Sequence, residues 1–274
     1  MKRIKLLSMK AGVLYLFLAM LLSACSKEYT PDPVTTPPPA NGQKLSRIQY
    51  DDGSYEAIEY NTNGTVKKIT NHVAFSNNTS EHIVYTFIYT GSNVTEIQGD
   101  DGSVIKYGYA NNQLVKAEIF VNGGTQVALY AYSYTNGKLT KTEGYTRKPG
   151  GGLSTTPTLK YEKEYYSDGN LKKMTLFYLD PATGTLDKTN VFVLTQYDTK
   201  PNTTALFENN PYLPLESLIP NNPLAEEHYD ESGNLIETVT HTYTYDASGN
   251  PLTRKTVTRS TGLPESIENA SFSY

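Results

Sequence analysis

The chain has 274 residues, with 24 Lys and Arg against 28 Asp and Glu, and it contains one cysteine, 23 tyrosines and no tryptophan. An acidic chain without a basic stripe is a poor candidate for binding nucleic acid, because the phosphates would repel it. The single cysteine excludes a disulfide bond within the chain.

The first 24 residues have the layout of a secretory signal peptide. Residues 1–10 carry four positive charges, and residues 11–22 form an apolar run of twelve, too short to span a bilayer comfortably. The sequence Leu22-Ser23-Ala24-Cys25 then resembles the lipobox of bacterial lipoproteins, whose cysteine is acylated and becomes the mature N-terminus. We therefore predict a lipoprotein signal peptide over 1–24 and lipidation of Cys25. The alternative is an ordinary signal peptide with an incidental cysteine.

A tether is predicted over residues 25–43, which contain five prolines and almost no large apolar side chain. Removal of the signal peptide would leave 20 basic against 28 acidic residues, a net charge near −8. The residues "SKEYT" after Cys25 resemble a short export signal of Bacteroidetes surface lipoproteins, which implies surface display rather than the periplasmic face. The remaining residues, 44–274, suit a single all-β repeat domain.

The body of the chain alternates between turn-forming and strand-forming residues. Clusters of Gly, Asn, Asp and Ser predict turns, and the short runs of Tyr, Thr, Val and Ile between them predict strands. No segment has a sustained helical period. Such short turns join antiparallel neighbours into a meander. The predicted turns cover residues 51–54, 61–64, 91–93, 100–103, 111–112, 122–124, 136–137, 167–170, 231–234 and 247–250.

A unit recurs in which a tyrosine precedes a polar turn that is followed by Val or Leu. We expect this trailing residue to be the first inward one of the next strand. Alternation along a strand also puts Tyr130, Tyr132 and Tyr134 on one face. The segment from His82 to Tyr89 is apolar on both faces, which predicts a central, buried strand. The trailing residues are Val66, Val94, Leu114, Leu139, Leu171, Leu235 and Leu252.

Two families share these features. The phrases "YDESGNLIE" from Tyr229 and "YDASGNPLT" from Tyr245 resemble the YD repeat of the RHS family, whose hairpins curl into a β-sheet shell. The lipobox, the spacer and "YDTKPNTT" (197–204) resemble Bacteroidetes lipoproteins of the DUF4595 type, with Thr203 where a second proline is usual. The resemblance implies an all-β fold, an antiparallel meander of YD-like hairpins forming a large curled or superhelical sheet. It implies an envelope location but no established activity.

One long irregular loop is predicted over residues 200–228. A gap of 64 residues separates Leu171 from Leu235, and residues 200–230 hold five prolines, which a central strand would not accept. An apolar loop of this length either covers something or binds something. We favour a plug, or a short helix around 214–218, that closes an open edge or end of the sheet.

The sequence contains no pattern that identifies a catalytic residue. We therefore expect that the protein is not an enzyme and that it has no cofactor and no metal site. The chain lacks the Gly-x-Ser-x-Gly, His-Glu-x-x-His and phosphate-loop motifs. The histidines at 72, 82, 228 and 241 are scattered; His228 and His241 flank one predicted hairpin and could meet across it, although we expect surface or packing roles. Acidic turns such as "DDGS" offer too few carboxylates for calcium.

The candidate ligand-binding residues are aromatic. They are Phe207 and Tyr212 in the loop, and the row Tyr130, Tyr132 and Tyr134, which could stack on sugars or a protein partner. We predict a lipoprotein anchored in the outer membrane or at the cell surface that acts as a binding or scaffold module. Its predicted partner is an envelope protein or a glycan. One alternative is a glycan-binding accessory protein, favoured by an exposed tyrosine row. The other is a cryptic hydrolase, favoured by acids or histidines that converge beneath the 200–228 loop.

Overall fold

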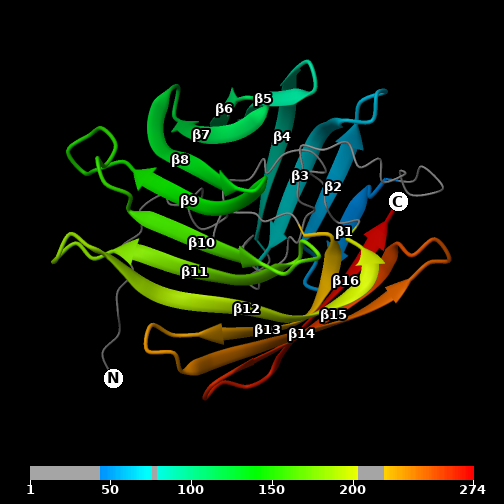
Figure 1. Cartoon of the computed structure of the whole chain (residues 1–274). Coiled ribbons are helices and arrows are strands. Elements are labelled where there is room, and N and C mark those ends of the chain that lie inside the picture. The colour runs from blue at the N-terminus through cyan, green and yellow to red at the C-terminus, as the bar shows by residue number, and fades with distance from the viewer. Residues whose placement is uncertain (1–43, 76–78, 203–218) are drawn as a thin grey trace.

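The computed structural model describes residues 44–75, 79–202 and 219–274, and its regular structure is entirely β-strand (Figure 1). The predicted signal peptide, Cys25, the tether, Phe207 and Tyr212 lie outside these ranges. The first eight strands are β1 (Arg47–Tyr50), β2 (Tyr55–Tyr60), β3 (Val66–Ala74), β4 (Ser80–Thr90), β5 (Asn93–Gly99), β6 (Val104–Ala110), β7 (Gln113–Val121) and β8 (Thr125–Thr135). The other eight are β9 (Lys138–Thr146), β10 (Leu159–Tyr165), β11 (Leu171–Leu179), β12 (Leu186–Pro201), β13 (Asn221–Tyr229), β14 (Leu235–Tyr245), β15 (Pro251–Ser260) and β16 (Ser266–Ser273).

The sixteen strands close into a barrel. Each strand pairs antiparallel with its neighbours in chain order, and β16 returns to pair with β1, where Ile48 stands opposite Phe272. The predicted antiparallel meander and its turns are confirmed. The prediction of an open superhelical sheet is wrong, because closure pairs the two edges that an open meander would leave exposed.

A tyrosine latch explains the recurring unit. The tyrosine at the end of a strand donates its hydroxyl to a backbone carbonyl one hairpin earlier, and four of the five acceptors belong to the trailing Val and Leu residues predicted above. In these five cases the latch ties a hairpin to the previous one across the sheet. The tyrosines of the two YD phrases bond to carboxylates instead, Tyr229 to Glu227 and Tyr245 to Asp198. The bonds, 2.7–2.8 Å long, run from Tyr60 to Leu45, Tyr89 to Val66, Tyr109 to Val94, Tyr165 to Leu139 and Tyr197 to Leu171.

A carboxylate clamp closes the YD turns. Asp246 accepts hydrogen bonds of 2.9 Å from both the backbone N–H and the side-chain amide of Asn250, four residues later. Asp198 makes the same pair of bonds, at 3.1 and 3.0 Å, with Asn222, which lies 24 residues later. The irregular region is therefore an insertion within one YD turn, and the pair of residues that normally closes this turn still meets at its base.

The insertion is shorter than the loop predicted over 200–228. Strand β12 continues to Pro201 and β13 begins at Asn221. Pro223 is accepted in β13 because it stands opposite Tyr197 where the register shifts, and bulges tolerate proline. Among the described strands no sheet edge stays unpaired, so there is no edge for the predicted loop to cover. The alternative, that it closes an end of the sheet, stays a prediction. The helix expected around 214–218 lies outside the described residues.

Alternate side chains along each strand point into the barrel and form an apolar core. Most of the trailing residues are buried as expected, among them Val94 and Leu114. Leu235 and Leu252 are 47% and 42% exposed, against our expectation; in the latter case Pro251 occupies the inward position. The expectation that residues 82–89 are buried on both faces is also wrong. Each barrel strand has an outer face, and Ile88 is 37% exposed beside the buried Phe87.

Candidate functional site

Four titratable side chains meet inside the barrel on one hairpin. Glu226 and His228 occupy alternate positions of β13, and Glu237 and His241 point the same way from β14. Alternation and register bring them together, because His228 stands directly opposite Glu237 and Glu226 opposite Val239. We refer to Glu226, His228, Glu237 and His241 as the His–Glu cluster.

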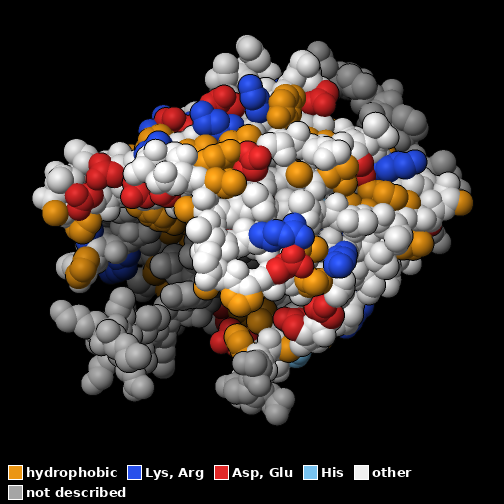
Figure 2. Space-filling model, turned by 90° about the horizontal axis from the view of Figure 1, so that it is seen from below, with side chains coloured by type: hydrophobic (Ala, Val, Ile, Leu, Met, Phe, Trp, Pro, Cys, Tyr) orange, Lys and Arg blue, Asp and Glu red, His pale blue; other side chains and the backbone are white. Residues whose placement is uncertain are grey.

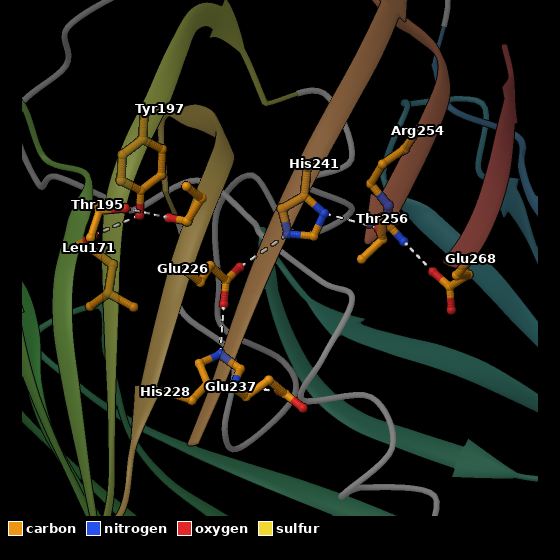
Figure 3. Close-up of polar contacts among 11 residues, drawn as sticks. Leu171, Thr195, Tyr197, Glu226, His228, Glu237, His241, Arg254, Thr256 and Glu268 are labelled. Carbon is orange, nitrogen blue, oxygen red and sulfur yellow. Dashed lines mark hydrogen bonds and ion pairs between the residues drawn. The ribbon is translucent and has the colours of Figure 1, made fainter. Parts of the chain in front are cut away.

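The His–Glu cluster is a continuous chain of polar contacts (Figure 3). Glu226 lies between the two histidines: its Oε2 is 3.3 Å from His228 Nε2, and its Oε1 is 3.3 Å from His241 Nε2. His228 Nδ1 is 2.8 Å from Glu237 Oε1. Both imidazoles are buried, so these charges interact with little screening by solvent.

Two hydroxyls extend the cluster onto β15. The Thr256 hydroxyl is 3.0 Å from His241 Nδ1, and the Ser260 hydroxyl donates to Glu237 Oε2 at 2.5 Å. Each residue stands opposite its partner in the register of β14 and β15. Both ring nitrogens of both histidines are therefore engaged.

The charges inside the barrel continue toward the closing strands. Arg254 on β15 is buried, and its Nη2 is 3.2 Å from Glu268 Oε1 on β16. Glu56 on β2 is inward as well. Burial raises the pKa of its carboxyl, and the attraction of Arg254 and a hydrogen bond from Tyr50 do not cancel that effect.

The environment lowers the pKa of Glu226 and raises the pKa of His228. Burial alone would raise the pKa of Glu226, but the hydrogen bonds and charges of His228 and His241 outweigh it and lower the pKa to about 2. Burial alone would lower the pKa of His228, but Glu226 and Glu237 outweigh it and raise the pKa above the usual 6.5. Both shifts favour an ionised carboxylate beside a protonated imidazole.

The cluster supports two kinds of chemistry. As an ion network its groups neutralise one another across β13 and β14. Thr256, His241 and Glu226 also form a hydroxyl–imidazole–carboxylate sequence, the arrangement used to activate a nucleophile. Within residues 44–75, 79–202 and 219–274, no group of three or more His, Cys, Asp or Glu side chains is arranged to hold a metal ion.

The sequence partly anticipated this site. His228 and His241 lie on one hairpin as predicted, but they are linked through Glu226 rather than by a contact with each other. Of the expected surface or packing roles, the surface position is wrong because both side chains are buried. The period-2 spacing of Glu226 with His228 and of Glu237 with His241 was the available signal. It shows which residues share a face, but not that this face points inward.

The predicted tyrosine row also points into the barrel. Tyr130 and Tyr132 are 4% and 5% exposed, and Tyr134 packs against the same core. These three residues share one face as expected, but their position does not provide an exposed surface for stacking on sugars. The other two candidates, Phe207 and Tyr212, lie outside the described residues.

Comparison with solved structures finds two proteins that share the fold at low sequence identity. A porin-like protein from Bacteroides uniformis has a TM-score of 0.57 and 15% identity over 84% of this chain and 96% of its own. A porin-like protein from Bacteroides vulgatus has a TM-score of 0.52 and 10% identity over 84% of this chain and 98% of its own. A DUF3836 family protein from Parabacteroides distasonis has a TM-score of only 0.26 and 14% identity over 51% of this chain and 87% of its own.

No protein-family model matches the chain, and no curated protein matches it. Membership of the DUF4595 or RHS families therefore stays a prediction. In the described ranges no helix is long and apolar enough to cross a membrane.

Proposed function

We propose that this chain is a lipid-anchored protein of the cell envelope, whose barrel stands in water beside the membrane and acts by binding rather than by catalysis. The observation that carries the proposal is the polarity of the barrel. Most of its buried inward side chains are apolar, apart from Lys163 and the charged groups on β2 and β13–β16, and its outer face carries many charged side chains. A barrel that faces lipid has an apolar outer band instead.

On the outer face of β9 and β10, positive and negative side chains neighbour one another along each strand and stand opposite one another across the two strands. On β10, Lys160 and Glu162 flank the inward Tyr161; on β9, Lys141 and Glu143 flank the inward Thr142. Lys160 stands opposite Glu143, and Glu162 opposite Lys141.

Lysine–glutamate pairs lie 2.7–3.0 Å apart along these strands and on β7, where Lys116 contacts Glu118. Figure 2 shows Lys, Arg, Asp and Glu side chains interspersed over one face of the molecule. In water such pairs cost little, whereas a lysine facing the bilayer midplane costs about 2–4 kcal/mol.

The lipid anchor would reconcile this surface with an envelope location. The two Bacteroides neighbours are called porin-like and share the fold at low identity. A charged outer face needs another attachment, and acylation at Cys25 followed by the proline-rich tether supplies one. The predicted partners are an envelope protein or a glycan.

Detergent phase partition of the full chain expressed in a bacterial host tests this proposal. The wild-type protein should enter the detergent phase, whereas residues 26–274, which lack both the apolar signal segment and Cys25, should remain in the aqueous phase with an unchanged far-UV spectrum. Ser23→Ala, also in the lipobox segment, is the control and should behave as wild type. A folded protein of residues 26–274 that still enters the detergent phase would show that the barrel itself binds lipid and would refute the proposal.

A hydrolase is the second candidate, because Thr256, His241 and Glu226 form the sequence of groups described above. We place it second because Glu226 is shared between two histidines, so its charge is balanced without a substrate. Hydrolysis of p-nitrophenyl butyrate that falls at least ~100-fold in both Thr256→Val and His241→Gln, but not in the outward Thr253→Val, would establish it.

A further inference from the structure

Three buried hydroxyls stand in a row on the inner wall of the barrel. Tyr132 on β8, Thr142 on β9 and Tyr161 on β10 are direct cross-strand neighbours. They are 5%, 0% and 1% exposed, and none of the three hydroxyl oxygens has a hydrogen-bond partner among the described residues.

The hydroxyl row contrasts with the other tyrosines of the barrel. Five tyrosines at hairpin ends donate to a backbone carbonyl through the latch. A buried hydroxyl without a partner is unfavourable, and folded proteins retain one mostly where water or a ligand completes its bonding. Three such residues that are cross-strand neighbours on one wall point to one common partner rather than three separate packing defects.

Packed apolar groups bound the row on one side. The next inward positions are Tyr130, Gly144 and Leu159, which are cross-strand neighbours in the same order. A Cβ atom added to Gly144 would lie 3.0 Å from Tyr130 Cε1 and 3.1 Å from Leu159 Cδ2, so this side is filled. Leu176, opposite Tyr161 on β11, extends the apolar wall.

The row is a neutral hydrogen-bonding surface. Burial raises the pKa of Tyr161 and of Tyr132 above the usual 10, and neighbouring tyrosines add to this effect. Both phenols therefore stay protonated and are able to donate as well as accept. The row itself carries no charge, and the buried Lys163 is the next inward residue of β10 after Tyr161. A charged group placed against the three hydroxyls would lose its hydration without gaining an opposite charge from them.

We propose that the hydroxyls of Tyr132, Thr142 and Tyr161 bind the oxygen-bearing head of an uncharged, otherwise apolar small molecule inside the barrel. The three hydroxyl oxygens are fully enclosed by the core, so the ligand would enter by displacing neighbouring apolar side chains, which would then hold its body. This inference rests on the binding function proposed above and names the ligand class and the site.

The test compares two probes of equal chain length, 1-octanol and 1-chlorooctane, of which only the first can donate a hydrogen bond. The protein is residues 26–274, which contain every strand of the closed barrel and lack the acylated cysteine. Calorimetric titration should show 1-octanol binding ~10-fold more tightly, the ratio that about one net hydrogen bond supplies. Octanoate above pH 7 should bind more weakly than 1-octanol because its head is charged.

Variants assign the selectivity to the hydroxyl row. Tyr132→Phe, Tyr161→Phe and Thr142→Val remove a hydroxyl and preserve the shape of the side chain. Each should lower the preference for 1-octanol ~2-fold, and the triple variant should abolish it. Tyr165→Phe, which removes a latch hydroxyl instead, is the matched control and should keep the preference.

Several results would overturn the inference. The two probes could bind equally, or neither could bind. The preference for 1-octanol could also survive in the triple variant. Any of these results would mean that the hydroxyl row does not bind the head of the ligand. Tighter binding of octanoate would contradict the uncharged ligand class. Failure here leaves detergent partition of the lipidated chain unaffected, so it is distinguishable from failure of the proposed envelope anchoring.

Discussion

Replacing Glu226 by Gln tests whether charge holds the His–Glu cluster together. The carboxylate of Glu226 contacts His228 and His241, each at 3.3 Å, and the substitution removes its charge with almost no change in shape. His228 would retain Glu237 and His241 would retain Thr256. Any decrease in the free energy of unfolding would therefore come from the lost ion pairs of Glu226 rather than from a cavity.

The expected loss follows from the pKa of Glu226. A fall from the usual 4.5 to about 2 corresponds to about 3 kcal/mol of stability from the ionised form. Because the folded-state pKa is the lower one, this contribution is fully present above about pH 4.5 and is lost as the pH falls through about 2. His228 has the opposite sign: its pKa is raised, so its contribution is full below 6.5 and is lost at higher pH. The Glu226→Gln deficit should therefore be largest between about pH 4.5 and 6.5.

Urea denaturation followed by far-UV circular dichroism measures the free energy of unfolding of both proteins at pH 6 and pH 3. We expect a deficit of about 3 kcal/mol at pH 6 that is clearly smaller at pH 3. Glu227→Gln, the outward neighbour on the same strand, should stay within about 0.5 kcal/mol of wild type. An equal deficit for Glu226→Gln at both pH values would refute the electrostatic explanation and assign the loss to packing.

Three further substitutions test the barrel architecture, each by the same urea titration. Tyr197→Phe removes the latch to Leu171 and should cost about 1 kcal/mol; no loss would mean that the latch is incidental. Asn222→Ala opens the clamp at the base of the insertion and should cost about 1–2 kcal/mol, whereas wild-type stability would show that the clamp is dispensable. Gly144→Ala should cost about 1–3 kcal/mol by overcrowding the inner wall, against almost nothing for Gly150→Ala, where the added methyl meets open space.

The local elements of this protein follow from nearest-neighbour chemistry, and the sequence therefore determined them. The predicted turns contain Asn111, Asn122 and Asn136 at positive φ, a conformation that asparagine tolerates better than most residues. Short turns then force antiparallel pairing of successive strands, which made the meander predictable. The tyrosine that precedes each turn was visible as a repeat, although its carbonyl acceptor was not.

Closure of the barrel was decided only by the tertiary structure. The pairing of β1 with β16 joins segments more than 200 residues apart, and it depends on the twist and stagger accumulated over all intervening strands. For the same reason the sequence did not show that an insertion of about twenty residues sits within one turn, since Asn222 and Asp198 meet only after β12 and β13 pair.

The candidate site was likewise determined partly by the sequence and partly by the tertiary structure. Period-2 alternation determined which residues share a face: Glu226 with His228, Glu237 with His241, and Tyr130 with Tyr132. It did not determine which face points inward, because strands β13 and β14 carry polar residues on both faces. Only the closed barrel placed the histidines and the carboxylates in one buried space, and burial next to one another is what shifts their pKa values.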